Sequence, residues 1–144
     1  MTLMHGSGQL RKFCEKECHV EQKQLIHTAS GKKIKAVIVV HVFGNLADME
    51  SIMDIAEEYH LKIIEDATEA LGSHYTKGRF AGKYAGTIGD FGAYSFNGNK
   101  IITTGGGAVT AKDAKTVAQC SIFPHRQRMI HIIIFIMKSD IIIA

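Results

Sequence analysis

The sequence of 144 residues contains no tryptophan, one proline and three cysteines. An odd cysteine count at this density argues against the disulfide framework that stabilises small secreted domains. Cys14 and Cys18, with His19 beside them, have the spacing of half of some zinc sites, but no second pair of ligands follows at a matching distance. We therefore interpret the cysteines as plain thiols, expect no metal, and expect a reducing cytoplasm as the compartment.

An excess of one charge and long apolar runs are also lacking. Lysine and arginine number 17 against 14 aspartates and glutamates, and the two signs are interleaved, which excludes the basic stripe of a nucleic-acid-binding protein. No apolar run approaches the roughly 20 residues that cross a membrane. Residues 1–14 do not have the pattern of a secretory signal. With 46% hydrophobic residues, the chain predicts one globular domain without nucleic-acid or membrane partners.

The centre of the chain predicts a strand–helix–strand unit. The apolar run Ala36–Val40 is typical of a strand buried on both faces of a parallel sheet. Asn45 is the expected N-cap of a helix that ends near His60. A second buried strand at 61–65 then ends at Asp66. Because ligands bind at the carboxyl ends of strands in open α/β sheets, this topology places Asp66 at a site.

A lysine just beyond another strand is the second candidate residue. The other predicted elements are a helix at 9–19, a loop or hairpin at 20–34 with its turn at "SGKK", a long loop or hairpin at 70–89, strands at 90–96 and 108–111, and a helix starting near Asp113. Lys100 follows the strand at 90–96, and the glycine run 105–107 is expected to bring backbone close to the lysine segment. A plain ion pair between Asp66 and Lys100 is the alternative to a functional pair.

Three stretches resemble a known family. They are "VHVFGN" at 40–45, "IEDATEALGS" at 64–73 and "GDFGAYSFNGNK" at 89–100. Together they resemble the DegT/DnrJ/StrS family of sugar aminotransferases, which use pyridoxal phosphate (PLP), and most closely its nucleotide-sugar C4-aminotransferase branch. The resemblance covers roughly residues 34–112. It implies an α/β fold that forms part of a type I, aspartate aminotransferase-like large domain, with a mainly parallel sheet and flanking helices.

The resemblance also implies a role for individual residues. Lys100 would bond covalently to the PLP aldehyde and then move a proton as a general acid–base. Asp66 would pair with the pyridinium nitrogen and keep the ring protonated. Ser95 would donate its hydroxyl to the phosphate, and Glu69 would lie near the phenolic oxygen. His41 stays open between a ligand-facing residue and a hydrogen-bonded structural one.

The implied reaction transfers an amino group from glutamate to the 4-keto carbon of a nucleotide-linked keto-deoxy sugar, with UDP as the expected nucleotide. The parent enzyme is expected to be a homodimer.

Two segments are expected in the chain. Residues 1–117 would be a partial PLP-binding large domain, with the N-terminal part of that domain and the C-terminal small domain absent. Residues 118–144 would be an aberrant tail from a shifted reading frame, since eight of the last fifteen residues are isoleucine. The isolated chain is therefore expected to be inactive. The alternatives are a non-catalytic remnant or a small phosphate-binding α/β module.

Overall fold

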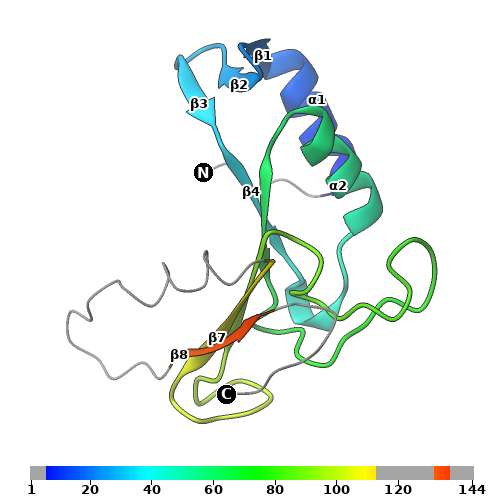
Figure 1. Cartoon of the computed structure of the whole chain (residues 1–144), viewed down its shortest axis with the longest axis vertical. Helices are drawn as coiled ribbons and strands as arrows, with labels where there is room; N and C mark the ends of the chain where they lie inside the picture. Colours follow the sequence, from blue (N-terminus) through cyan, green and yellow to red (C-terminus); the bar gives the residue numbers. More distant parts are fainter. Residues whose placement is uncertain (1–5, 113–131, 137–144) are drawn as a thin grey trace.

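A computed structural model of the chain describes residues 6–112 and 132–136 (Figure 1). The elements are α1 (Ser7–Glu17), β1 (Cys18–Glu21), β2 (Gln24–His27), β3 (Lys32–Ile34), β4 (Ala36–Val40), the 3-10 turn η1 (Val42–Gly44), α2 (Met49–Glu58), β5 (Lys62–Asp66), β6 (Phe91–Ser95), β7 (Gly107–Ala111) and β8 (Ile132–Ile136). The strands form two sheets. One has the order β1-β2-β3, and the other has the order β4-β5-β6-β7-β8.

The small sheet is antiparallel throughout and follows α1 directly. The helix predicted at 9–19 ends at Glu17 instead, because Cys18 has the extended dihedrals φ −129° and ψ 164° and begins β1. The hairpin alternative predicted for 20–34 is confirmed. Its "SGKK" turn joins β2 to β3, and Gly31 in that turn has φ +62°. In Figure 1 this sheet lies at the opposite end of the molecule from β7 and β8.

The larger sheet is mainly parallel, as predicted. β4, β5 and β6 run in the same direction, with Val40 opposite Asp66 and Asp66 opposite Ala93. β7 runs antiparallel to β6 and starts with Gly107 opposite Ser95, and β8 is parallel to β7. The carboxyl ends of β4, β5 and β6 therefore meet at one edge of the sheet, which we call the carboxyl edge.

The N-cap of α2 is Asp48, so the prediction of Asn45 was wrong. The Asp48 side chain accepts a hydrogen bond from the backbone N–H of Ser51 at 3.3 Å. Hydrogen bonds from Ser51 are the main reason that the pKa of Asp48 is lowered. Asn45 instead closes η1, where its N–H donates to the carbonyl of Val42 at 3.0 Å. The helix also ends earlier than predicted, at Glu58 rather than near His60.

The helices α1 and α2 lie side by side (Figure 1); α2 packs on β5 of the larger sheet, and α1 packs on α2 and β1. Val39 and Ile63 are buried beneath them, in a core that also takes in Leu25 of the small sheet. The opposite face of β4 is open, with Ile38 58% and Val40 47% exposed. The expectation that 36–40 is buried on both faces was therefore wrong, because in the described part of the chain the helices cover one face of this edge strand.

Two earlier expectations lie largely outside the described residues. The helix predicted from Asp113 falls in the segment 113–131. Of the predicted tail 118–144, only the backbone of β8 is described, so the shifted reading frame stays a prediction. Within 6–112 and 132–136, no helix has the length and apolar character needed to cross a membrane.

Candidate functional site

Asp66 is the last residue of β5 and lies at the carboxyl edge, as the sequence predicted. Its backbone is fixed on both sides. The Asp66 carbonyl accepts the N–H of His41 at 3.0 Å, and the next N–H, of Ala67, donates to Ala93 of β6 at 2.9 Å. One carboxylate oxygen, Oδ1, accepts the N–H of Thr68 at 3.1 Å. Among the described residues no donor reaches Oδ2, so half of this carboxylate is available to a ligand.

Lys100 lies on the loop that follows the neighbouring strand β6 and is paired with Glu69. Lys100 Nζ is 3.7 Å from Glu69 Oε1, and the lysine side chain is only 18% exposed. The other Glu69 oxygen, Oε2, accepts the N–H of Phe43 at 3.0 Å. Phe43 has φ +53°, a left-handed conformation that is costly for an aromatic residue. Glu69 therefore joins the lysine loop to the strained turn after β4.

Ser95 ends β6 with its hydroxyl directed at the start of the same loop. Ser95 Oγ accepts the N–H of Asn97 at 3.4 Å, which leaves its own hydrogen free to be donated. The N–H of Lys100 is already bonded to Asn97, at 2.9 Å. In the described chain the N–H groups of Gly98 and Asn99 have no such partner. One hydroxyl and two amides thus provide donors of the kind that bind a phosphate.

The glycine run approaches the end of β6 rather than Lys100 itself. The N–H of Phe96 donates to Gly106 at 2.9 Å, and the N–H of Gly105 donates back to Phe96 at 3.0 Å. A Cβ on Gly107 would lie 2.6 Å from the carbonyl oxygen of Tyr94. The glycine run therefore does come close to another backbone segment, but that segment is the end of β6 at Tyr94 and not the loop that carries Lys100.

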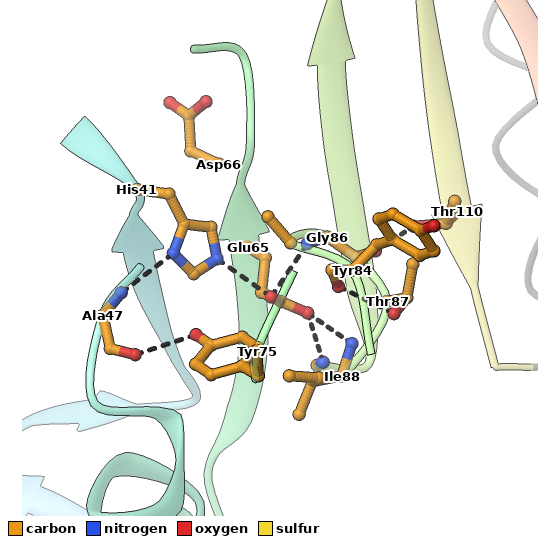
Figure 2. A network of polar contacts seen from close by, with 12 residues as sticks. His41, Ala47, Glu65, Asp66, Tyr75, Tyr84, Gly86, Thr87, Ile88 and Thr110 are labelled. Atoms are coloured by element: carbon orange, nitrogen blue, oxygen red, sulfur yellow. Dashed lines mark hydrogen bonds and ion pairs between the residues drawn. The ribbon is translucent and has the colours of Figure 1, made fainter. Parts of the chain in front are cut away.

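A buried glutamate beside Asp66 was missed in the sequence. Glu65 is fully buried, and its carboxylate accepts four hydrogen bonds (Figure 2). The donors are His41 Nε2 at 2.9 Å and the backbone N–H groups of Gly86 at 2.9 Å, Ile88 at 2.6 Å and Gly89 at 2.5 Å. Four bonds fill the acceptor capacity of a carboxylate. A charged residue at the end of an apolar strand was the signal that could have identified it.

These bonds decide the ionisation of Glu65. Burial by itself would raise the pKa of the carboxyl, but the hydrogen bonds from His41 and from the backbone of Gly89, Gly86 and Ile88 outweigh it and hold the pKa below the ordinary value. Glu65 is therefore an anion whose every acceptor position is occupied. It has no capacity left for a ligand, so its role is structural.

His41 is the hydrogen-bonded structural residue of the two alternatives. It is fully buried, and its Nδ1 accepts the N–H of Ala47 at 3.1 Å. An accepting Nδ1 carries no proton, so Nε2 carries it and donates to Glu65. The imidazole is thus neutral and in a single tautomer. Figure 2 shows it between Ala47 and Glu65, with the Asp66 carboxylate directed away from the network.

The opposite edge of the sheet, where β5 and β6 begin and which we call the amino edge, offers a weaker candidate. A shallow hollow there is lined in part by His60, Lys62, Asp90 and Lys112. Lys62 and Asp90 already pair at 3.0 Å, and the lysine is 69% exposed, as expected of a surface ion pair. In the part of the chain that the structure describes, no three His, Cys, Asp or Glu side chains are placed to hold a metal ion. The carboxyl edge therefore remains the candidate site.

Comparison with known proteins identifies the family. The model of the DegT/DnrJ/EryC1/StrS aminotransferase family matches residues 14–128. The chain belongs to this family. The match is wider than the stretch 34–112 that carried the resemblance in the sequence.

Two curated relatives and one solved structure illustrate the similarity. GDP-perosamine synthase of Escherichia coli O157:H7 is 43% identical over 100 residues, which cover 69% of this chain and 26% of the relative. A dTDP-3-amino-3,6-dideoxy-alpha-D-galactopyranose transaminase of Aneurinibacillus thermoaerophilus is 39% identical over 92 residues, 62% of this chain and 24% of the relative. A DegT DnrJ EryC1 StrS aminotransferase from Brucella abortus has a TM-score of 0.56 at 28% identity, over 70% of this chain and 27% of that one. The chain thus spans about a quarter of the length of these proteins.

The family implies PLP, and the residues at the carboxyl edge fit it. The carboxylate with a free oxygen suits the ring nitrogen of PLP, and the largely buried lysine suits its aldehyde. The hydroxyl and the two free amides suit its phosphate. The fold is the expected partial α/β domain, and its solved neighbours are aminotransferases. Sequence comparison thus confirms the family.

Proposed function

We propose that the carboxyl edge is a PLP site and that the chain is part of a sugar aminotransferase. Lys100 is the residue that bonds to the cofactor aldehyde, Asp66 pairs with the ring nitrogen, Glu69 lies by the phenolic oxygen and Ser95 donates to the phosphate. The observation that carries the proposal is the convergence of these residues, since β5 and β6 are adjacent and parallel and Glu69 contacts Lys100.

Each residue contributes what its chemistry allows. PLP, when bound, supplies the electron sink for breaking the C–H bond of the amino donor. Asp66 Oδ2 holds a proton on the ring nitrogen, and the hydroxyl of Ser95 orients the phosphate. Lys100 would hold the aldehyde end of the cofactor and would serve as the proton carrier, and its Nζ is paired at 3.7 Å with Glu69 in the structure.

The substrate proposal is a nucleotide-linked keto-deoxy sugar, aminated at its 4-keto carbon with glutamate as donor. The names of the two relatives contain GDP and dTDP, which supports a nucleotide-linked sugar as substrate. UDP is the proposed nucleotide, and neither of these names supports it over GDP or dTDP. The parent enzyme is proposed to be a homodimer. The free thiols of Cys14 and Cys18 are consistent with a cytoplasmic protein. Because the chain spans a quarter of these relatives, we propose that turnover by it alone is negligible.

Borohydride reduction in the presence of PLP tests the site directly. The reagent fixes a covalent lysine–PLP link, and peptide mass spectrometry locates it. We expect the label on Lys100 and its loss in Lys100→Arg. Asp66→Asn should keep the lysine but weaken PLP binding by about 10-fold or more, since an ionic hydrogen bond is lost.

Lys62 serves as a control lysine within the same chain. It also pairs with a carboxylate at a strand end, that of Asp90, but at the amino edge and largely in solvent. Equal labelling of Lys62 and Lys100 would mean unselective reaction and would refute the PLP site. Binding of inorganic phosphate without any label on Lys100 would favour the phosphate-binding module instead.

A further inference from the structure

The Glu65 network joins three chain segments that are distant in sequence. Its donors come from His41 at the end of β4 and from the loop at 86–89 that precedes β6. His41 in turn holds Ala47, whose carbonyl accepts the hydroxyl of Tyr75 at 2.8 Å. The two segments beside the end of β5 are thus fixed to a single carboxylate (Figure 2).

Asp66 is the next residue after Glu65 and belongs to the other face of the strand, because side chains alternate along a β-strand. It has few fixed contacts of its own on that face. Its carboxylate has the one hydrogen bond to Thr68, whereas its backbone is held by His41 and through Ala67 by Ala93. The direction of the Asp66 carboxylate therefore depends on how firmly the backbone at 65–67 is held.

We propose that Glu65 and His41 are positioning residues for the Asp66 carboxylate. They hold the end of β5 from one face so that Asp66 presents Oδ2 in a fixed direction on the other. His41 acts twice, through its ring on Glu65 and through its N–H on the Asp66 carbonyl. This inference rests on the proposed function only for what Asp66 would meet, the ring nitrogen of PLP. The positioning itself is a property of the chain without any ligand.

A matched pair of variants tests the role of His41. His41→Leu removes the ring donor and acceptor, whereas His41→Gln retains one of each and carries no charge, as the neutral imidazole carries none. In the 144-residue chain labelled with carbon-13 at aspartate carboxyl groups, we expect His41→Leu to shift or broaden the Asp66 carboxyl resonance. The amides of Ile88 and Gly89 should exchange about 10-fold faster. In His41→Gln we expect the Asp66 resonance and the exchange rates of the two amides to be closer to those of the natural chain.

Asp90→Asn is the control for a general loss of stability. Asp90 also holds β5, but from its amino end, where it accepts the N–H of Ile63 at 2.9 Å. This variant should speed exchange at Ile63 and leave the Asp66 resonance in place. If His41→Leu alters the Asp66 resonance no more than Asp90→Asn does, the network is only structural and the positioning role is refuted.

A measurement on the unmodified chain covers the case in which His41→Leu does not fold. Nitrogen-15 shifts of the His41 ring should show Nε2 protonated and Nδ1 unprotonated, and protonation at Nδ1 would overturn the proposed network. None of these measurements uses PLP. A failure to label Lys100 would therefore count against the proposed function, while the Asp66 and His41 signals would still decide the positioning role.

Discussion

The two carboxylates at the end of β5 are neighbours in sequence and opposites in environment. Glu65 is fully buried with four hydrogen-bond donors, whereas Asp66 is half-buried with one. The same contrast extends to their surroundings. The Glu65 side of the strand is closed by His41 and the loop at 86–89, while on the other side the Asp66 carboxylate accepts one hydrogen bond, from the N–H of Thr68.

The number of hydrogen bonds that each carboxylate already accepts distinguishes a structural carboxylate from one that can bind a ligand. Charge does not, since both residues are acids. A carboxylate with every acceptor position filled can hold backbone but cannot bind a ligand. A carboxylate with a free oxygen, such as that of Asp66, can bind one.

The largest effect should come from Glu65→Gln. The amide cannot accept all four hydrogen bonds and places its own N–H₂ against backbone donors, so we expect a loss of about 3 kcal/mol in the free energy of unfolding. Urea unfolding measures it. Glu57→Gln, whose side chain is 62% exposed and pairs with Arg79, is the control and should cost less than about 0.5 kcal/mol. Equal losses in the two variants would contradict the buried network.

Acid should reduce the contribution of Glu65 to the free energy of unfolding. The pKa of Glu65 is lower in the folded chain than its ordinary value of 4.5. Its stabilising effect is therefore fully present above about pH 4.5 and is lost as the pH falls through the lower, folded pKa. We expect the gap in unfolding free energy between the natural chain and Glu65→Gln to narrow on acidification. A gap that is constant down to the acid transition would argue against an ionised Glu65.

Gly92→Ala tests the packing behind the network. A Cβ on Gly92 would overlap the Gly86 carbonyl and the Thr110 hydroxyl, so the loop that donates to Glu65 has to move. We expect a destabilisation of about 2 kcal/mol in thermal or urea unfolding. Gly98→Ala is the matched control, because nothing lies within 4 Å of its added Cβ. A similar loss of stability in both variants would contradict the close packing at Gly92.

Tyr94→Phe should have a smaller effect. It removes the hydrogen bond from the Tyr94 hydroxyl to the carbonyl of Ala85, at a cost of about 1 kcal/mol at neutral pH. Burial, and then the charge of Glu65, raise the pKa of Tyr94 from 10.0 to about 12. This stabilising term is present below pH 10 and is lost as the pH rises towards 12. The difference between the two proteins should therefore shrink over that range, and a constant difference would contradict the buried hydroxyl.

Glu69→Gln should have the smallest effect on stability, about 0.5 kcal/mol or less, since the carboxylate is 40% exposed and an amide oxygen can still accept the N–H of Phe43. Its larger effect should be on chemistry. Without the carboxylate Lys100 Nζ loses its ion-pair partner and no longer has to separate from it, so labelling by PLP and borohydride should become faster. A slower reaction would mean that Glu69 assists Lys100 instead of restraining it.

The sequence predicted the strands, and the placement of Asp66 and Lys100 after two of them, where apolar runs and family motifs agree. The strand at 36–40, the strand that ends at Asp66 and the loop of Lys100 are all where the pattern put them. The cap of α2 was misjudged because Asn45 and Asp48 are both good capping residues. Only the fold shows that Asn45 is already used in closing η1.

Other features depend on contacts that no local pattern contains. Glu65 finds its partners 21 to 24 residues away along the chain. One is His41 after β4, and the other three are amides of the loop at 86–89, whose sequence has little periodicity. The open face of β4 follows from where α1 and α2 pack, which the apolar run itself does not specify. These are the features that tertiary packing decides.

The turn at Phe43 is strained and lies beside the lysine loop. Its ring is 84% exposed and its backbone is left-handed, a state that costs on the order of 1–3 kcal/mol and persists where surrounding contacts offset that cost. The hydrogen bond from the Phe43 N–H to Glu69 Oε2 is joined by those from the Asn45 N–H to the Val42 carbonyl and from the Ser73 hydroxyl to the Gly44 carbonyl. Because the other oxygen of Glu69 lies 3.7 Å from Lys100 Nζ, one carboxylate links the lysine to an exposed aromatic residue.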